Sequence, residues 1–394
     1  MTCTVVQDLE QPRLYDAVSR AAGTGMPFAV VDPTWPPTFL ALASGQIEQA
    51  DSRGLFVDGD MVVFSSGSTG RPRGIVRTVE SWRVSFAAFS DITGITAQDR
   101  VWLPGPLWSS LFLYGAFHAG AVGAQMIFRD ESPSRATVLH CVPSQLPGVL
   151  SRAQAGGLPL VRRVVVAGDH CAETLRRRCE AAGWEVLEYY GAAELSLVAW
   201  RDRAGPLRAF PGVATELRTE AGLRRESGPG PETEQETRAG RDPGVLWARS
   251  PYLAKDYLSA RDHGPLRRDP QGWATVQDLA LAVPGGLEIV GRGDNAVTSG
   301  GHTVVVEEVE QLLRGLPGVD QVAVLGVPHP QLGQVLTAVV VGPAADSTLR
   351  TAVAGMPAPS RPRRWLHADA LPLTSAGKLR RDALPDLVVR LGRL

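Results

Sequence analysis

Short apolar runs alternate with amphipathic stretches over most of the 394-residue chain. The runs Met61–Phe64 and Val164–Ala167 are continuously apolar, as is typical of strands that are covered on both faces. In Glu173–Ala182, by contrast, apolar and basic positions recur at helical spacing. Strands that alternate with helices in this way predict an α/β fold.

Two places interrupt this alternation. Thr219–Gly244 is rich in Glu, Arg, Gly, Pro and Thr, and it predicts a solvated surface excursion in preference to a partner-binding loop. Near Gly291–Asn295 the pattern changes to a strand and an amphipathic helix over Val304–Leu313, followed by further strands. We therefore expect a large α/β domain over residues 1–292 and a small α+β domain over residues 293–394.

Composition narrows the class of protein. Lys and Arg number 40 and Asp and Glu 41, a net charge of −1 that argues against a nucleic-acid binder. The four cysteines form no C-x-x-C pair, which fits a reducing cytoplasm. Met1–Gln11 lacks a basic region followed by an apolar region, so we expect no signal peptide. Leu107–Phe128 lacks Asp, Glu, Lys and Arg but contains polar residues and glycines, so it predicts a buried helix and strand, not a membrane span.

A loop rich in glycine and hydroxyl groups follows the strand Met61–Phe64. It consists of Ser65, Ser66, Gly67, Ser68, Thr69 and Gly70, and Arg73 lies three residues beyond. Glycines allow the backbone to approach an anion closely, and amide and hydroxyl groups can then hold phosphate oxygens. It is not a Walker A loop, because no Gly-Lys-Ser/Thr follows at the required spacing.

This loop resembles the phosphate loop of the adenylate-forming superfamily, which includes acyl- and aryl-CoA ligases. Four further motifs match that family in order: Tyr189–Glu194, Trp273–Leu279, Gly291–Asp294 with Ser299–Gly301 and Glu307–Glu310, and Pro372–Arg380. The resemblance spans Ser65 to Arg380, and it implies the adenylate-forming fold with a small mobile C-terminal domain. The short segment before Ser65 implies a shortened N-terminal region, and the layout is most similar to compact actinobacterial o-succinylbenzoate–CoA ligases.

The resemblance implies ATP-dependent activation of a carboxylic acid as an acyl-adenylate. Lys378 would contact the carboxylate and the α-phosphate, the loop with Arg73 would hold the β- and γ-phosphates, and Glu194 would ligate Mg²⁺. The remaining implied roles concern the nucleoside, the hinge and the thiol tunnel: Tyr190 with Gly191 at the adenine, Asp278 and Arg292 at the ribose, Asp294 as the hinge, and Gly300 and Gly301 along the tunnel. The implied cofactors are ATP, Mg²⁺ and coenzyme A or a carrier-protein phosphopantetheine.

Three positions depart from the family pattern. Arg73 replaces a lysine, Ala193 replaces a threonine beside the motif acid, and Gln277 replaces a glycine before Asp278. None of these changes removes a principal catalytic group, though each could slow the reaction.

The acid pocket is expected between the phosphate loop and Glu194. The candidates are Trp108, Ser109, Phe112, Gly168, Asp169, His170 and Ala192. The resemblance also implies that amino-acid-activating members have an aspartate near the start of the helix after Pro106, to bind the α-ammonium group. Leu107–Ser110 contains no acidic residue, so an α-amino acid is disfavoured.

Several alternatives stay open at this point. The acceptor is CoA or a carrier protein, and a carrier-loading enzyme of secondary metabolism or a non-catalytic scaffold are the rival functions. A second copy of the chain is an open partner. A dinucleotide-binding site at Gly291–Ala296 is disfavoured, because Thr298–Gly301 would break the helix that such a site requires.

Overall fold

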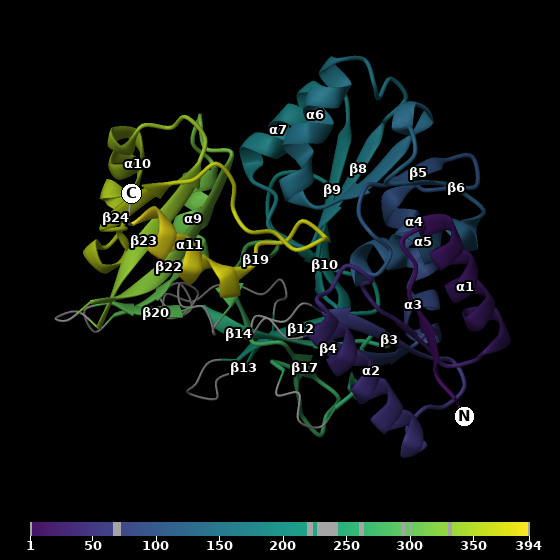
Figure 1. The fold of residues 1–394 in the computed structure, drawn as a ribbon. Helices are drawn as coiled ribbons and strands as arrows, with labels where there is room; N and C mark the ends of the chain where they lie inside the picture. The colour runs from purple at the N-terminus through teal and green to yellow at the C-terminus, as the bar shows by residue number, and fades with distance from the viewer. Residues whose placement is uncertain are drawn as a thin grey trace.

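The computed structural model of this chain describes residues 2–65, 72–218, 224–226, 243–259, 264–292, 296–299, 302–329 and 333–392. Within these residues the strands form four sheets (Figure 1). Three sheets build the N-terminal part of the molecule, and the fourth belongs to the C-terminal part, which begins at Ala296.

The first sheet supports the predicted phosphate loop. Its order is β1 (Thr4–Val6), β2 (Phe28–Val30), β3 (Asp60–Ser65), β4 (Arg73–Thr78) and β15 (Asp256–Tyr257). The first three strands are parallel, whereas β3 and β4 form an antiparallel hairpin with Ser65 opposite Arg73. Helices α1 (Gln11–Thr24) and α2 (Pro37–Ser52) complete this layer, and α1 ends at Gly25 in the left-handed conformation that favours glycine.

The second sheet is the predicted α/β layer. Its order is β11 (Arg208–Ala209), β10 (Ser196–Arg201), β9 (Glu185–Ala192), β8 (Arg163–Ala167), β7 (Val138–Cys141), β5 (Arg100–Leu103) and β6 (Gln125–Phe128), with the strands from β9 to β6 parallel. In β8, Val165 faces one core while Val164 and Val166 face another. Helices α6 (Leu146–Gln154) and α7 (Glu173–Ala181) cover the second of these faces, which explains the continuous apolar run.

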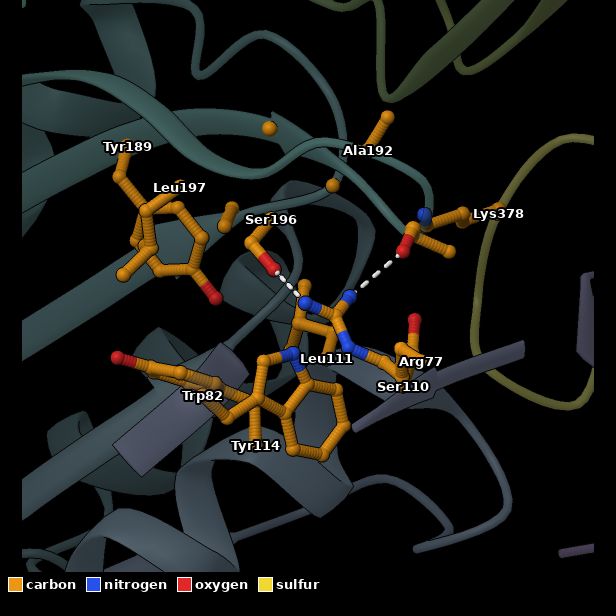
Figure 2. A pocket seen from close by; sticks show the side chains of 14 residues that line it. Arg77, Trp82, Ser110, Leu111, Tyr114, Tyr189, Ala192, Ser196, Leu197 and Lys378 are labelled. Atoms are coloured by element: carbon orange, nitrogen blue, oxygen red, sulfur yellow. Dashed lines mark hydrogen bonds between the residues drawn. The ribbon is translucent and has the colours of Figure 1, made fainter. Parts of the chain in front are cut away.

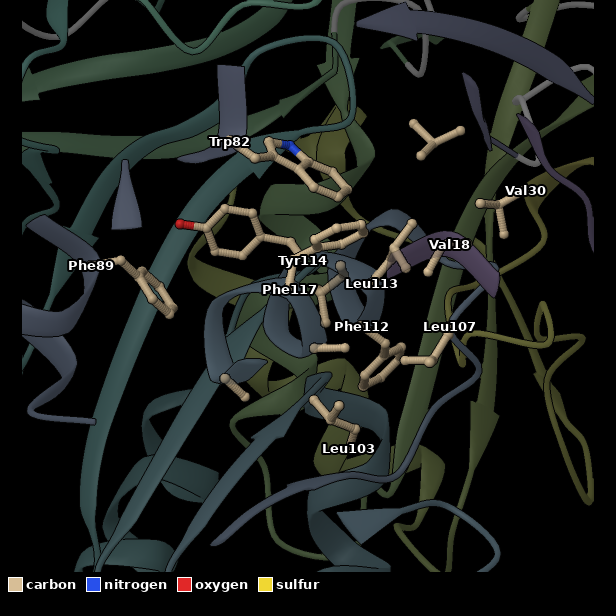
Figure 3. Close-up of a cluster of buried hydrophobic side chains, with 14 of the residues drawn as sticks. Val18, Val30, Trp82, Phe89, Leu103, Leu107, Phe112, Leu113, Tyr114 and Phe117 are labelled. Carbon is tan, nitrogen blue, oxygen red and sulfur yellow. The ribbon is translucent and has the colours of Figure 1, made fainter. Parts of the chain in front are cut away.

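The largest core lies between the first two sheets (Figure 3). Helix α5 (Ser110–Val122) supplies much of it, including Phe112, Tyr114 and Phe117, and helices α3 (Glu80–Arg83) and α4 (Phe86–Thr93) add Trp82 and Phe89. The uncharged stretch 107–128 is thus a buried helix followed by strand β6, as predicted. Among the described residues, no helix is both long enough and apolar enough to cross a membrane.

The third sheet contains the two predicted ribose residues, Asp278 and Arg292. It consists of β12 (Ala214–Arg218), β13 (Arg224–Glu226), β14 (Gly244–Arg249), β16 (Arg267–Arg268), β17 (Ala274–Thr275), β18 (Asp278–Val283) and β19 (Gly286–Arg292). Most of the predicted surface excursion over Thr219–Gly244 lies outside the described residues. The exceptions are β13, which pairs with β12, and Pro243 with Gly244, the second of which begins β14. Strand β19 continues to Arg292, so no helix begins at Gly291 as a dinucleotide site would require.

The C-terminal part is a sheet with helices on both faces. It contains β20 (Ala296–Ser299), β21 (His302–Val305), α9 (Val306–Arg314), β22 (Gln321–His329), β23 (Gly333–Val341), α10 (Asp346–Ala352), β24 (Arg364–His367) and α11 (Leu384–Leu391). Helices α9 and α10 pack on one face and α11 on the other, so the predicted α+β character is confirmed. Residues 293–295 lie outside the described part, and the domain boundary at 292/293 stays a proposal that agrees with the change of sheet between β19 and β20.

Candidate active site

Lys378 lies on a hairpin of the C-terminal part that reaches into the N-terminal part. The Thr374 amide donates to the Lys378 carbonyl at 2.7 Å, and the Arg380 amide donates to the Pro372 carbonyl at 2.8 Å. The lysine lines a pocket that holds about 470 Å³ of space, part of it open to solvent (Figure 2). A β-carbon on Gly168 would lie 3.0 Å from Lys378 Cε, so the glycine leaves room for the lysine to enter.

The turn between β9 and β10 also lines this pocket. Gly191, Ala192 and Ala193 line it. A β-carbon on Gly191 would lie 2.0 Å from the carbonyl oxygen of Ser196, so only glycine fits between the two strands. The motif acid Glu194 follows and is buried, and the Tyr257 hydroxyl donates to its Oε1 at 2.9 Å.

Arg77, at the floor of the pocket, holds this turn in place. Its guanidinium donates to the carbonyl oxygens of Ala193 at 2.8 Å and Tyr252 at 2.6 Å, and to the Ser196 hydroxyl at 2.5 Å. It also lies 4.9 Å from the ring centroid of Trp82. Burial lowers the pKa of Arg77. Because the side chain is buried and bonded to the turn, it positions the turn, and its charge adds positive potential to the pocket.

The predicted ribose residues meet on adjacent strands. Asp278 begins β18 and lies directly opposite Arg292 of β19. The Tyr190 hydroxyl donates to Asp278 Oδ2 at 2.6 Å, which joins two motifs that are 88 residues apart. The Arg292 side chain lies outside the described part.

The predicted phosphate loop connects β3 to β4. Ser65 and Arg73 are described at its two ends, whereas Ser66, Gly67, Ser68, Thr69 and Gly70 lie outside the described residues. Arg73 is buried and lies near the Tyr257 hydroxyl, on which its charge acts. The hinge residue Asp294 and the tunnel glycines Gly300 and Gly301 also lie outside the described part.

Glu194 offers the donor chemistry that Mg²⁺ prefers. Magnesium is commonly held by one or two carboxylates together with phosphate oxygens and water. The described residues contain no cluster of three or more His, Cys, Asp or Glu side chains, so a protein-only metal cage is absent from that part of the chain. A single carboxylate beside the expected phosphates fits a metal that arrives with its nucleotide.

The predicted pocket residues divide into two groups. Gly168 and Ala192 line the pocket with Lys378, whereas the other five predicted residues do not line it: Trp108, Ser109, Phe112, Asp169 and His170. Phe112 is fully buried in the large core, and Ser109 is the residue before helix α5.

Trp108, Asp169 and His170 contact the C-terminal part instead. The Trp108 Nε1–H group donates to Ser375 Oγ at 3.2 Å. Asp169 pairs with Arg314 at 3.7 Å, and Arg314, together with the amide of His170, lowers the pKa of the Asp169 carboxyl against the effect of its desolvation. His170 Nε2 lies 3.3 Å from the side-chain amide nitrogen of Gln311.

Helix α5 lines the pocket with residues that sequence analysis missed. Ser110, Leu111 and Tyr114 face the pocket, and they are displaced by one or two positions from the predicted Ser109 and Phe112. Every position of this helix from Leu111 to Ala119 is buried, so the sequence pattern contains no polar face that would set its rotation. Arg77 was also missed, although an arginine directly after the apolar Ile75 and Val76 is a signal that could have been used.

Comparison with known proteins places these features in a family. The model of the AMP-binding enzyme family matches residues 46–258, and the model of the AMP-binding enzyme C-terminal domain matches residues 308–378. The acyl–CoA ligase YhfT of Bacillus subtilis, whose function is uncharacterized, is 30% identical over 81% of this chain and 66% of its own length. A salicylyl-CoA synthase / salicylate adenylyltransferase of a Streptomyces species is 28% identical over 84% of this chain and 63% of its own length.

Solved structures show the same fold. The o-succinylbenzoate CoA synthetase MenE of Bacillus subtilis, in complex with its acyl-adenylate intermediate, superposes with a TM-score of 0.78 at 18% identity, over 97% of this chain and 87% of its own. ATP-bound MatB of Rhodopseudomonas palustris superposes with a TM-score of 0.73 at 23% identity, over 98% and 79%. This chain spans about two thirds of the length of the first curated relatives it matches. With both family models matched in order and this fold around Lys378, the chain belongs to the AMP-binding, adenylate-forming enzyme family.

Proposed function

We propose that this protein activates a carboxylic acid with ATP, forms an acyl-adenylate, and transfers the acyl group to a pantetheine thiol. The observation that carries the proposal is the entry of Lys378 into a pocket that the Gly191–Ala193 turn also lines. A carboxylate is a poor electrophile, and its attack on the α-phosphate of ATP releases pyrophosphate and creates a good leaving group. Negative charge develops in that transition state, so a positioned cation is the group expected to accelerate it.

Different residues of this chain would bind the reacting groups, the ribose and the metal ion. Lys378 would neutralise the substrate carboxylate and the α-phosphate from the same side of the pocket. Asp278, oriented by Tyr190, would accept hydrogen bonds from the ribose hydroxyls. Glu194, oriented by Tyr257, would hold Mg²⁺, which neutralises phosphate charge when it is bound with ATP.

The pocket walls favour an aromatic or other largely apolar acid. Trp82, Leu111 and Leu197 supply apolar surface. Tyr114 and Tyr189 present mainly their rings, because their hydroxyls already lie 2.8 Å from Ser85 Oγ and 3.0 Å from His140 Nε2. An α-amino acid remains disfavoured, because no carboxylate is among the described residues that line this pocket.

An aromatic acid with a second negative charge, such as o-succinylbenzoate, is the first substrate to test. The pocket carries the positive potential of both Lys378 and the buried Arg77. Two relatives support an aryl acid by their names, the salicylyl-CoA synthase and a 2-succinylbenzoate–CoA ligase of Enterococcus faecalis that is 25% identical. We propose coenzyme A as the acceptor and the cytoplasm as the location, with a carrier protein as the alternative acceptor.

Pyrophosphate release with ATP and Mg²⁺ tests the proposal across a panel of aryl, acyl, dicarboxylic and amino acids, with and without CoA. We expect release that depends on one class of acid and falls at least about 100-fold in Lys378→Ala, the scale on which removal of a charge-stabilising group slows catalysis. Arg390→Ala, on the surface of α11, is the matched control and should retain wild-type release. ATP binding without release for any acid, with or without CoA, would point to a carrier protein as the missing acceptor or to an acid outside the panel. Absence of both release and ATP binding would favour the scaffold alternative.

A further inference from the structure

The tip of the Lys378 hairpin is gripped by the N-terminal part at three consecutive residues. Ser375 contacts Trp108 and Asp32. Ala376 is buried in the large core, whose other buried members all belong to the N-terminal part. The carbonyl oxygen of Gly377 accepts a hydrogen bond from Ser144 Oγ at 2.6 Å. The lysine itself follows directly.

The contacts of Ser375 form a directional chain of hydrogen bonds. The Trp108 indole N–H donates to Ser375 Oγ at 3.2 Å, and the Ser375 hydroxyl donates to Asp32 Oδ2 at 2.8 Å. The other oxygen of Asp32 accepts from the Thr34 amide at 2.8 Å and from the Thr34 hydroxyl at 2.6 Å. Asp32 and Trp108 are both buried, so the Ser375 hydroxyl is held between two side chains that water reaches poorly.

We propose that Asp32 and Trp108 are positioning residues for Lys378, and that they act through Ser375 in the adenylation step alone. Asp32 follows β2, and 343 residues separate it from Ser375. Neither residue lines the pocket, so neither touches the reacting atoms. The inference rests on the proposed function, because it assigns the gripped hairpin to one of the two half-reactions.

Charge explains why this contact can select one position of the hairpin. A hydrogen bond to an ionised carboxylate is stronger than a bond between neutral groups. Once Ser375 leaves, Asp32 Oδ2 and the indole N–H lose their partners in a mostly buried site, which disfavours departure. Thioester formation from an adenylate that has already formed needs no lysine at the α-phosphate, so loss of the grip should not slow it.

Two substitutions break the chain of hydrogen bonds without adding bulk. Ser375→Ala removes both contacts of the hydroxyl. Asp32→Asn keeps the shape but offers one acceptor oxygen, so an amide N–H₂ group must face either Ser375 or Thr34. Ser347→Ala, an exposed serine of α10, is the matched control.

The test compares the two half-reactions. Adenylation is followed by pyrophosphate release, and thioester formation by AMP release from a chemically prepared adenylate with CoA. We expect Ser375→Ala and Asp32→Asn to slow adenylation about tenfold or more, the effect of losing hydrogen bonds to a charged group, and to change thioester formation less than about twofold. Equal slowing of both half-reactions would indicate a merely structural role and overturn the proposal, as would unchanged adenylation.

Hydrogen exchange tests whether these contacts hold the hairpin, even if no acid is turned over by the wild-type protein. The amides of Thr374, Gly377 and Lys378 donate within the hairpin, and their exchange should accelerate in Ser375→Ala but not in Ser347→Ala. Unchanged exchange at these amides would overturn the grip itself. A wild-type protein that neither binds ATP nor releases pyrophosphate, together with accelerated exchange in the variant, would keep the grip and reject the proposed function.

Discussion

The hydroxyl of Tyr190 donates to Asp278 Oδ2 across 2.6 Å and thereby joins the end of β9 to the start of β18. The family resemblance assigns these residues to the adenine and the ribose of one nucleotide. The bond orients the carboxylate before the nucleotide arrives, so the position of each residue depends on the other. Preorganisation of this kind reduces the entropy that must be lost on binding.

Tyr190→Phe should therefore weaken ATP binding while the fold is retained. We expect the KM for ATP to rise about tenfold, the effect of one hydrogen bond to a charged group, with a smaller change in kcat. The half-buried Tyr15 of α1 allows the matched control Tyr15→Phe, which should leave the KM unchanged. A KM that stays at the wild-type value in Tyr190→Phe would show that Asp278 needs no support from the tyrosine.

Arg77→Met should destabilise the protein substantially. The substitution leaves the carbonyl oxygens of Ala193 and Tyr252 without their donor inside the protein, and each such group costs about 1–3 kcal/mol. We expect the free energy of unfolding in urea to fall by about 2–4 kcal/mol, reduced somewhat because a buried charge is also removed. The exposed Arg83 of α3 provides the control Arg83→Met, for which a change within about 0.5 kcal/mol is expected.

Gln277→Gly should stabilise the protein. Gln277 adopts a φ of 64°, the left-handed region that disfavours residues with a β-carbon, at the position where the family motif has glycine. We expect the free energy of unfolding to rise by about 0.5–1 kcal/mol, net of the greater chain entropy of glycine. Gln271→Gly, at an exposed site without a positive φ, should lower it instead. A loss of stability in Gln277→Gly would show that the side-chain contact with Pro265 outweighs the backbone strain.

Acid should destabilise the fold through its buried histidines. Burial lowers the pKa of His118 to about 4 and that of His140 to about 3, from an ordinary value of 6.5. Between these values and pH 6.5 the unfolded chain binds more protons than the folded one, so stability falls as the pH is lowered through this window. For His118 alone the loss by pH 4 is roughly 2–4 kcal/mol.

Urea titrations at several pH values between 4 and 7 would measure this slope. His118→Gln should reduce the slope by about one proton. An equal slope in wild type and His118→Gln would show that His118 is not the group responsible.

Local sequence information was sufficient for much of the fold. The continuous apolar run of β8 predicted a strand covered on both faces, because only such a strand buries consecutive side chains. The period of Val304–Leu313 predicted a strand and then a helix, which the structure shows as β21 and α9. The motifs also identified the family, because short glycine-rich and charged segments are tied to the chemistry they perform.

Tertiary structure decided which residues meet at the pocket. The rotation of α5 could not be read from a helix that is apolar on all sides, so the predicted Phe112 lies in the core while Leu111 and Tyr114 line the pocket. Arg77 and Ala193, or Asp32 and Ser375, are brought together only by packing across more than a hundred positions of the chain.

The division between what the sequence predicted and what only the tertiary structure decided has a physical origin. Secondary structure and motif chemistry depend on residues that lie within a few positions of one another, and the sequence shows these neighbours directly. Which side chain reaches into a pocket, and which holds the hairpin that carries Lys378, depends on how sheets and helices pack. Packing is a property of the whole core, so these contacts became visible only in the folded molecule.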